Sequence, residues 1–335
     1  MENNILELFP AEDRPLWQKV AEKAGKLQEI RLRVGQPVMV YMNGREYFLT
    51  KDGRLSLVLQ DAYRAGRAEI QRLLVHNCEA SPYAFEAEIK QGFLPVKGGH
   101  RIGITGQAVL DDRGHVKILK NISGINLRIS HEIFGAGREL LPLLFEEGNF
   151  KSTLLIGPPG SGKTTLLRDL IRYISDGNPY CPGMNVGVVD ERGEIGGCYM
   201  GVPRNDLGIR TDILDACPKT EGLLQLIRGM APAVIAVDEI GKEEDMQALR
   251  YAVTCGVKIL ATVHGNGSED LLQKEKNYLK CGKHPFAETF EYFVILEKKN
   301  GNCVVAAHYG REEFYAQTDR DFAGNTGMFG SGNMV

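Results

Sequence analysis

Apolar and polar residues alternate with a period of two in the first part of the chain, which is the pattern of half-buried β-strands. Ile30, Leu32 and Val34 alternate with charged neighbours. The run VMVYM is followed by Asn43-Gly44 and by REYFLT. An Asn-Gly pair between two such runs predicts a tight β-hairpin.

A second, longer alternation covers residues 100–122 and is interrupted by a turn at 111–114. It predicts another pair of strands. Residues 61–76 and 82–90 carry apolar residues at the looser spacing of amphipathic helices. We therefore expect residues 1–135 to form a small α+β domain.

The segment INLRIS, residues 125–130, continues this strand pattern. Ile125, Leu127 and Ile129 share one face of the expected strand, because successive side chains point to opposite sides. Arg128 therefore lies on the other face and points away from the core of this domain.

From about residue 136 the pattern changes to short apolar runs separated by helical windows. The runs have the length of buried strands, and the windows have the apolar spacing of helices packed on a sheet. This order predicts an α/β domain over 136–310, with helices covering a mostly parallel sheet. The loop GPPGSGKT within it makes the P-loop NTPase (RecA-like) type the expected one. The glycine-rich end of the chain, 311–335, is expected to be a flexible tail. The expected strands are TLLIG, NVGVVD, AVIAVDE, KILATVH and FEYFVILE, and the expected helices cover 164–174, 221–230 and 243–254.

The composition is that of a globular protein of two domains. The 335 residues are 43% hydrophobic and 25% charged, which excludes a disordered or fibrous chain. The net charge of −3 lacks the basic excess of a dedicated nucleic-acid binder, so nucleic acid is not expected as a partner. No apolar stretch approaches the ~20 residues of a membrane-spanning helix, and the acidic N-terminus does not resemble a signal peptide. We expect a cytoplasmic protein, whose seven scattered cysteines are reduced structural thiols.

The segment GPPGSGKT matches the phosphate-binding pattern G-x-x-x-x-G-K-[ST], also called Walker A. It follows an apolar strand and opens a helix with an apolar face, which is the context that such a loop requires. Backbone amides of the loop converge on phosphate oxygens at the helix N-terminus, where the helix dipole favours anions. Lys163 is expected to reach the β- and γ-phosphates of ATP, and the Thr164 hydroxyl to bind Mg²⁺. The expected ATP-binding residues are Gly157, Pro158, Pro159, Gly160, Ser161, Gly162, Lys163, Thr164 and Thr165.

Two adjacent carboxylates, Asp238 and Glu239, follow the apolar run AVIAV. They stand at the carboxyl end of the expected strand, where open parallel sheets bind their ligands. We expect Asp238 to hold Mg²⁺ through water and Glu239 to polarise the water that attacks the γ-phosphate. The alternative is that the two carboxylates merely begin a solvated loop.

Two further strand ends point to the same edge of the sheet. NVGVVDERGE places Asp190, Glu191, Arg192 and Glu194 after an apolar run, and KILATVHGN places Thr262 and His264 after another. We expect His264 to sense the γ-phosphate, because no second histidine stands at the spacing of a metal site. A purely structural histidine is the alternative.

Taken in order, these motifs resemble those of the secretion ATPases of type II and type IV systems, and more closely those of the stage III sporulation AA family of endospore-forming bacteria. The resemblance covers nearly the whole chain. VVDERGEI is similar to the acidic box of the secretion ATPases, and ATVHGN to their histidine box. The segments that carry the resemblance are EIRLRVGQP, HRIGITGQ, NISGINLRIS, GPPGSGKTTLLRD, VVDERGEI, GVPRNDLGIRTDILDACPK, VIAVDEIGK and ATVHGN.

The resemblance implies a homo-oligomeric ring, expected to be a hexamer, with ATP between the two domains and arginines completing the site. By its position in the motif Arg128 would be such an arginine. Arg204 and Arg210 are further candidates, either reaching across a subunit boundary or lying in solvated loops. The chain departs from many secretion ATPases in having Asp238 where they have Gly and Gly241 where they have Arg. The implied task is to energise a membrane channel or secretion complex during endospore formation, with the protein at the inner face of a membrane through partner proteins.

Three classes of function compete for this sequence. The favoured one is an ATP-hydrolysing mechanoenzyme, in which closing sites shift domains within a ring. The alternative is a nucleic-acid translocase or helicase ring, which would need basic residues along its pore. The third is a nucleotide-binding switch without appreciable turnover. The absence of an N-K-x-D guanine motif disfavours a GTPase switch, and Glu239 favours hydrolysis over binding alone.

Overall fold

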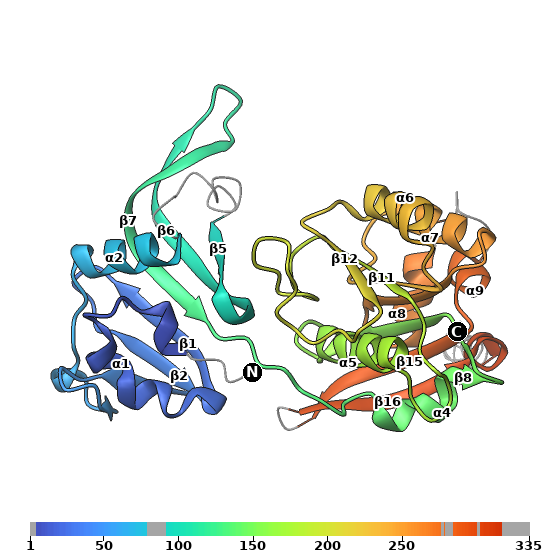
Figure 1. The fold of residues 1–335 in the computed structure, drawn as a ribbon, viewed down its shortest axis with the longest axis horizontal. Coiled ribbons are helices and arrows are strands. Elements are labelled where there is room, and N and C mark those ends of the chain that lie inside the picture. The colour runs from blue at the N-terminus through green and yellow to red at the C-terminus, as the bar shows by residue number, and fades with distance from the viewer. Residues whose placement is uncertain (1–4, 79–91, 276–277, 279–283, 300–301, 317–335) are drawn as a thin grey trace, which may run out of the picture. The chain divides into compact units, whose positions relative to one another are not determined.

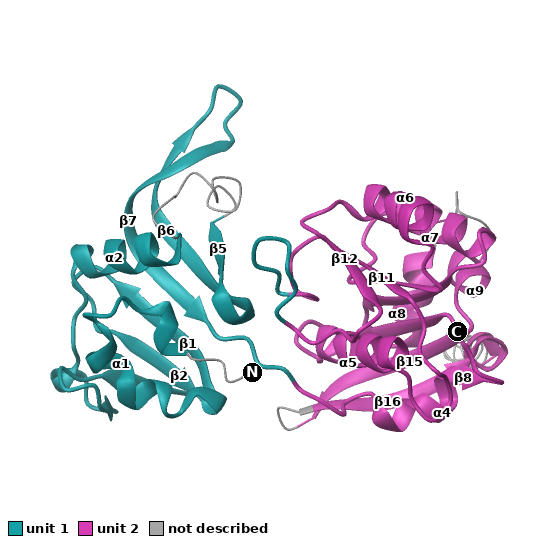
Figure 2. Ribbon diagram, viewed as in Figure 1, with its two compact units in different colours: residues 1–132, 197–204 teal, residues 133–196, 205–335 magenta. Residues whose placement is uncertain are grey.

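The computed structural model describes residues 5–78, 92–275, 278, 284–299 and 302–316. They form two compact units, which Figure 2 distinguishes by colour. Unit 1 comprises Met1–Glu132 and Gly197–Arg204, and unit 2 comprises Ile133–Gly196 and Asn205–Val335. The division after Glu132 lies near the boundary expected at residue 135, whereas the assignment of 197–204 to unit 1 is not foreseen by the sequence pattern. The helix expected at 82–90 lies outside the described residues.

Unit 1 is built on an antiparallel sheet of strand order β4-β3-β2-β1-β7-β6-β5 (Figure 1). Asn43 and Gly44 both have positive φ, as a tight two-residue hairpin requires, and the hairpin predicted around them is confirmed as β2 and β3. The strands are β1 (Leu27–Arg33), β2 (Met39–Met42), β3 (Arg45–Leu49), β4 (Leu55–Ser56), β5 (Phe93–Val96), β6 (His100–Leu110) and β7 (Val116–Arg128). The helices are α1 (Arg14–Ala21) and α2 (Arg67–Asn77), with 3-10 turns η1 (Ile5–Leu8), η2 (Ala24–Lys26), η3 (Leu59–Asp61) and η5 (Lys97–Gly99).

The alternation predicted along β6 and β7 is a core pattern over only part of their length. Ile102 and Leu127 are fully buried, whereas Leu110 and Ile118 on the same two strands are exposed. Figure 1 shows the β6–β7 ribbon continuing beyond the other strands of unit 1. Within the described ranges, β1 pairs with β7 only over residues 124–128 and β5 pairs with β6 only over residues 100–103, so the far end of the ribbon pairs only with itself there.

Unit 2 contains a seven-stranded sheet of order β12-β11-β13-β14-β10-β15-β16, in which every described pair is parallel except β15 with β16. This arrangement confirms the predicted α/β class. The strands are β10 (Thr153–Gly157), β11 (Val186–Asp190), β12 (Thr211–Asp215), β13 (Val234–Val237), β14 (Lys258–His264), β15 (Tyr292–Lys299) and β16 (Asn302–Gly310), with a separate pair β8 (Phe145–Glu146) and β9 (Asn149–Phe150). The helical elements are η6 (Arg138–Leu140), α4 (Leu141–Leu144), α5 (Lys163–Asp176), α6 (Lys219–Met230), α7 (Glu243–Thr254), α8 (Ser268–Glu275) and α9 (Pro285–Thr289).

Helices cover both faces of this sheet. Every residue of β10, β11 and β13 is buried, which is why these strands read as unbroken apolar runs. Leu154 and Ile156 of β10 pack in one core cluster with α6 and α7, whereas Leu155, between them, packs in a second cluster with α5. The period of two along the strand therefore separates the two helical layers. Among the described residues, no helix is both long and apolar enough to cross a membrane.

In unit 2 the described structure continues past residue 310, where the α/β domain was expected to end and the tail to begin. Residues 311–316 are helical, and Phe314 is fully buried and stacked on Phe293 with ring centroids 4.2 Å apart. The rest of the expected tail, 317–335, lies outside the described residues.

Candidate nucleotide-binding site

The carboxyl ends of neighbouring parallel strands bring the predicted motifs of unit 2 to one edge of its sheet. Gly157 at the end of β10 is in register with His264 at the end of β14. Val189 of β11 is in register with Val237 of β13, so Asp190 and Asp238 follow at the same level. Four segments that are far apart in the sequence thus meet where such sheets bind ligands.

The phosphate loop joins β10 to α5 and depends on glycine at two crowded positions. A Cβ on Gly157 would lie 2.4 Å from Ser161 Oγ, and a Cβ on Gly162, which has φ +86°, would lie 2.6 Å from Cys303 Sγ. Any larger residue would displace the loop. Ser161 Oγ is buried and has no hydrogen-bond partner within the described part of the chain. This hydroxyl, beside the unpaired amides that begin any helix, fits the phosphate oxygens of ATP.

Lys163 stands at the first turn of α5 and is buried. Its Nζ donates hydrogen bonds to the carbonyl oxygens of Gly157 (2.7 Å) and Pro158 (2.9 Å) and to Nδ1 of His264 (3.0 Å). Burial lowers the pKa of this ammonium, against the opposing attraction of Asp238 and Glu239.

His264 connects Lys163 to the predicted catalytic carboxylate. Because an ammonium can only donate, His264 Nδ1 is the acceptor and the proton of the neutral ring is on Nε2. That Nε2 lies 3.3 Å from Glu239 Oε1. His264 therefore lies between Lys163 of the phosphate loop and Glu239. Its role as a γ-phosphate sensor stays a prediction.

Asp238 holds the two hydroxyls that flank it. Thr164 Oγ1 donates to Asp238 Oδ2 (2.9 Å), and Thr262 Oγ1 donates to Asp238 Oδ1 (2.6 Å). The oxygens of Thr164 and Asp238 are the hard donors that Mg²⁺ prefers, and a P-loop Mg²⁺ takes its other ligands from phosphate and water. In the described ranges, no group of three or more His, Cys, Asp or Glu is placed to hold a metal ion.

Glu239 has a strained backbone that is fixed by neighbours. Its φ is +45°, in the left-handed region that non-glycine residues rarely adopt. Its amide donates to Thr262 Oγ1 (2.8 Å) and to Asp238 Oδ1 (3.0 Å). The sequence pattern predicted Thr262 at this edge of the sheet, but not its hydrogen bonds to Asp238 and to the Glu239 amide.

The acidic residues after β11 have different roles. The buried Asp190 carboxylate accepts hydrogen bonds from the amides of Glu194, Ile195 and Gly196, and so closes its own loop. Burial raises the pKa of Asp190 to about 6, although these three donors oppose the shift. Glu191 forms an ion pair with the buried Lys219, which lowers the pKa of its carboxyl. Neither carboxylate contacts Glu239, Asp238 or the phosphate loop, and Lys219 was missed by sequence reasoning.

Of the three arginines expected to complete the site, Arg128 and Arg204 belong to unit 1 and Arg210 belongs to unit 2. Arg128 belongs to unit 1, where its side chain is 65% exposed and 4.0 Å from Glu29, so the predicted outward orientation is confirmed. The guanidinium of Arg204 lies over the ring of Tyr199 at 5.7 Å. Arg210 Nη1 donates to the Ser175 carbonyl (2.9 Å) near the C-terminal end of α5, roughly 18 Å along that helix from the phosphate loop. The contribution of these arginines to an ATP site stays a prediction.

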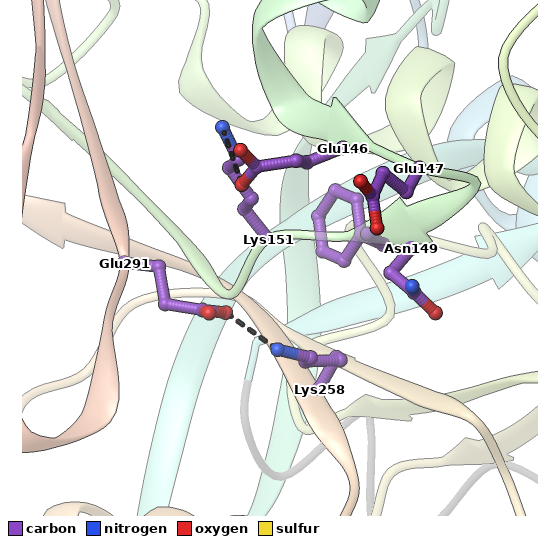
Figure 3. Close-up of a pocket in the computed structure, with 7 residues that line it drawn as sticks. Glu146, Glu147, Asn149, Lys151, Lys258 and Glu291 are labelled. Atoms are coloured by element: carbon purple, nitrogen blue, oxygen red, sulfur yellow. Dashed lines mark hydrogen bonds and ion pairs between the residues drawn. The ribbon is translucent and has the colours of Figure 1, made fainter.

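A separate cavity of about 290 Å³ lies by the amino ends of β10, β14 and β15, away from the phosphate loop (Figure 3). Its two lysines are paired with carboxylates, Lys151 with Glu146 (3.4 Å) and Lys258 with Glu291 (2.7 Å). These lysines are already neutralised, so the cavity is less suited to a triphosphate than the phosphate loop is. It is lined by Glu146, Glu147, Asn149, Phe150, Lys151, Lys258 and Glu291.

A glycine-rich loop between a buried strand and a helix, with Lys163, Thr164 and the Asp238-Glu239 pair beside it, defines a P-loop protein of the α/β class. The model of the family described as "Sporulation stage III, protein AA" matches residues 1–314. The chain belongs to this family, and the resemblance predicted from its motifs is confirmed.

Relatives and solved structures agree with this assignment. The chain is 38% identical over 313 residues to stage III sporulation protein AA of Bacillus subtilis (strain 168), covering 92% of this chain and 95% of that protein. It is similar in fold to the pilus retraction motor PilT with bound ADP, with a TM-score of 0.62, 18% identity, and coverage of 98% of this chain and 90% of that one. It is also similar to the Legionella pneumophila ATPase DotB, with a TM-score of 0.59, 16% identity, and coverage of 93% and 83%. The chain thus has the fold of the secretion ATPases.

Proposed function

We propose that this chain is a magnesium-dependent ATPase of the secretion type. The observation that carries the proposal is one connected set of side chains at the phosphate loop. In it Lys163 contacts His264, His264 reaches Glu239, and Thr164 contacts Asp238. This set supports phosphoryl transfer to water, because it offers an anion cradle, a cation for the phosphates, an oxygen ligand for Mg²⁺ and a carboxylate base.

In this proposal the loop amides and Lys163 bind the phosphates of ATP, and Thr164 and Asp238 hold Mg²⁺. When bound, Mg²⁺ supplies positive charge beside the β- and γ-phosphates. Glu239 orients a water molecule and accepts its proton as the water attacks the γ-phosphate. Arg128 of unit 1 is the arginine proposed to complete the site, because its side chain is exposed.

We further propose that hydrolysis moves the two units against each other within a homo-oligomeric ring, a hexamer, and that this motion energises a membrane channel or secretion complex during endospore formation. Membership of the sporulation family supports the cellular setting, and the fold shared with the motor PilT and the ATPase DotB supports the mechanical role. The proposed location is the cytoplasm, at the inner face of a membrane, through partner proteins.

Two substitutions test the ATPase proposal. Lys163→Ala should abolish productive ATP binding, because it removes the cation of the loop. Glu239→Gln should keep ATP binding, measured by calorimetry with Mg²⁺, but reduce the hydrolysis rate roughly 10²-fold or more. Glu244→Gln, an exposed carboxylate on the neighbouring helix α7, is the matched control and should behave like the wild type.

Hydrolysis by Lys163→Ala at a rate near that of the wild type would overturn the assignment of the loop. Hydrolysis by Glu239→Gln at the wild-type rate would show that another residue acts as the base. A strong stimulation of hydrolysis by single-stranded RNA or DNA, lost steeply with added salt, would instead favour a nucleic-acid translocase.

A further inference from the structure

The carboxylate of Glu239 is held from both sides. Its Oε1 faces His264 Nε2 at 3.3 Å, and its Oε2 accepts a hydrogen bond from Arg192 Nη1 at 2.7 Å. We propose that Arg192 is a positioning residue that orients Glu239 to accept a proton from the attacking water, an inference that rests on the proposed ATPase function. Arg192 acts through Glu239 and has no contact with nucleotide in this proposal.

The loop that presents Arg192 is built to hold one conformation. Asp190, directly before it, is buried and binds three consecutive amides, those of Glu194, Ile195 and Gly196. The far end of the loop is also tied, because Asn205 Nδ2 donates to the Ile195 carbonyl at 2.7 Å. The Cα of Arg192 therefore has a fixed place relative to the end of β11.

Two adjacent charged residues of this loop, Glu191 and Arg192, form ion pairs with different residues. Glu191 pairs with Lys219, whose side chain is 9% exposed and comes from the start of α6. Arg192 pairs with Glu239 across 47 residues of sequence.

The Glu239 end of the contact is equally well determined. Its backbone amide donates hydrogen bonds to Thr262 Oγ1 and Asp238 Oδ1. Its φ of +45° places the backbone in the left-handed region, where the chain turns. With the backbone fixed, the remaining freedom is in the side-chain torsions. His264 and Arg192, one on each oxygen, restrict those torsions to one orientation, which is what a positioned base requires.

The solvent exposure of the Arg192–Glu239 pair distinguishes a positioning role from a contribution to the stability of the fold. The Arg192 side chain is 64% exposed and that of Glu239 is 30% exposed. Solvated ion pairs of this kind contribute little to the stability of the fold. Removing the guanidinium should therefore leave thermal unfolding unchanged and alter only the orientation of the carboxylate.

The test compares Arg192→Ala and Arg192→Lys with Arg228→Ala, an exposed arginine on α6 as the matched control. We expect Arg192→Ala to lower kcat about 10-fold, with the dissociation constant for ATP and the unfolding midpoint within error of the wild type. Arg192→Lys should recover part of the loss, because lysine keeps the charge but not the forked geometry. In a Glu239→Gln background, Arg192→Ala should lower kcat less than twofold further, because the carboxylate that it orients is absent.

A crystal structure of nucleotide-free Arg192→Ala gives a readout besides activity. The Glu239 carboxylate should leave the orientation that it has in the wild type, while the loop at 190–196 stays in place. An unmoved carboxylate would overturn the inference even if the wild type hydrolysed no ATP, so the two proposals fail separately. An unchanged kcat in an active enzyme, a full 10-fold additional loss in the Glu239→Gln background, or a weakened ATP affinity at unchanged kcat would also overturn it, the last by making Arg192 a nucleotide contact.

Discussion

A buried histidine in unit 1 makes the stability of that unit dependent on pH. His100 opens β6 and is 2% exposed, and its Nδ1 accepts a hydrogen bond from the Ser130 amide at 3.1 Å. Burial, together with the nearby His131, lowers the pKa of His100 from 6.5 to about 4. The folded unit therefore holds a neutral ring, since protonating Nδ1 would break that hydrogen bond and bury a charge.

The size of the effect follows from linkage between proton binding and folding. The unfolded chain takes up a proton at His100 near pH 6.5 and the folded unit only near pH 4, so the unfolded state binds more protons between these values. Stability is then unaffected above about pH 7 and falls as the pH decreases through this window. The two pKa values give a loss of about 2 kcal/mol between pH 8 and pH 5, approaching about 3.4 kcal/mol below pH 4.

The single tryptophan of the chain makes this loss measurable in unit 1 alone. Trp17 lies in the core of that unit, stacked on Phe9 with ring centroids 4.4 Å apart. Urea unfolding followed by tryptophan fluorescence at pH 8, 6 and 5 should show the loss in the wild type. His100→Asn, whose amide oxygen can still accept from Ser130, should lose about 2 kcal/mol less between pH 8 and pH 5. His115→Asn, an exposed histidine of the same unit, should follow the wild type.

The reasoning fails if His100→Asn loses as much stability between pH 8 and pH 5 as the wild type does. Such a result would mean that His100 is protonated in the folded unit, or that another group dominates the acid response. A His100→Asn variant that is already unfolded at pH 8 would be replaced by His100→Gln, which also keeps an amide oxygen.

Three further predictions concern the site and the helix behind it. Thr262→Val should lower kcat about 10-fold with little change in ATP affinity, because Asp238 and the Glu239 amide both lose the hydroxyl that joins them; an unchanged rate in steady-state assays would remove Thr262 from the site. Asp169→Ala should cost about 3 kcal/mol or more in unfolding free energy, since this buried carboxylate accepts from the Gly135 and Gly137 amides and pairs with Arg172; a loss below 1 kcal/mol by circular dichroism would contradict this. Arg128→Ala should depress hydrolysis more than ATP binding, and unchanged kinetics would make it a surface arginine.

Local patterns predicted the parts of the site that depend on a few consecutive residues. The strand, the glycine-rich loop and helix α5 follow one another in the sequence, and the crowding at Gly157 and Gly162 explains why only glycine serves there. The position of Asp238 and Glu239 followed from the rule that parallel strands present their carboxyl ends to ligands. The predicted helix 243–254 is confirmed in full as α7, because its apolar spacing is regular and its ends are marked.

The features that were not predicted depend on contacts between residues far apart in the sequence. The strand β12, Thr211–Asp215, was not predicted, since all five of its residues are only half-buried at the edge of the sheet and lack an apolar run. The contacts of Arg192 with Glu239 and of Lys219 with Glu191 join residues 47 and 28 positions apart. Such pairs depend on strand order, which periodicity does not contain. Likewise, the alternation along β6 and β7 does not show at which residues burial of the apolar side chains ends.

In the proposed ATPase, the contacts of Lys163 link nucleotide binding to the orientation of Glu239. Its ammonium has three donors, and the carbonyls of Gly157 and Pro158 and the ring of His264 occupy all three. A phosphate oxygen can be bound by Lys163 only if one of these acceptors is released. If that acceptor is His264 Nδ1, the ring is free to reorient, and Arg192 remains as the partner of Glu239. Lys163→Ala therefore removes ATP binding and also frees the His264 ring, whereas Arg192→Ala changes the orientation of Glu239 and leaves the phosphate loop intact.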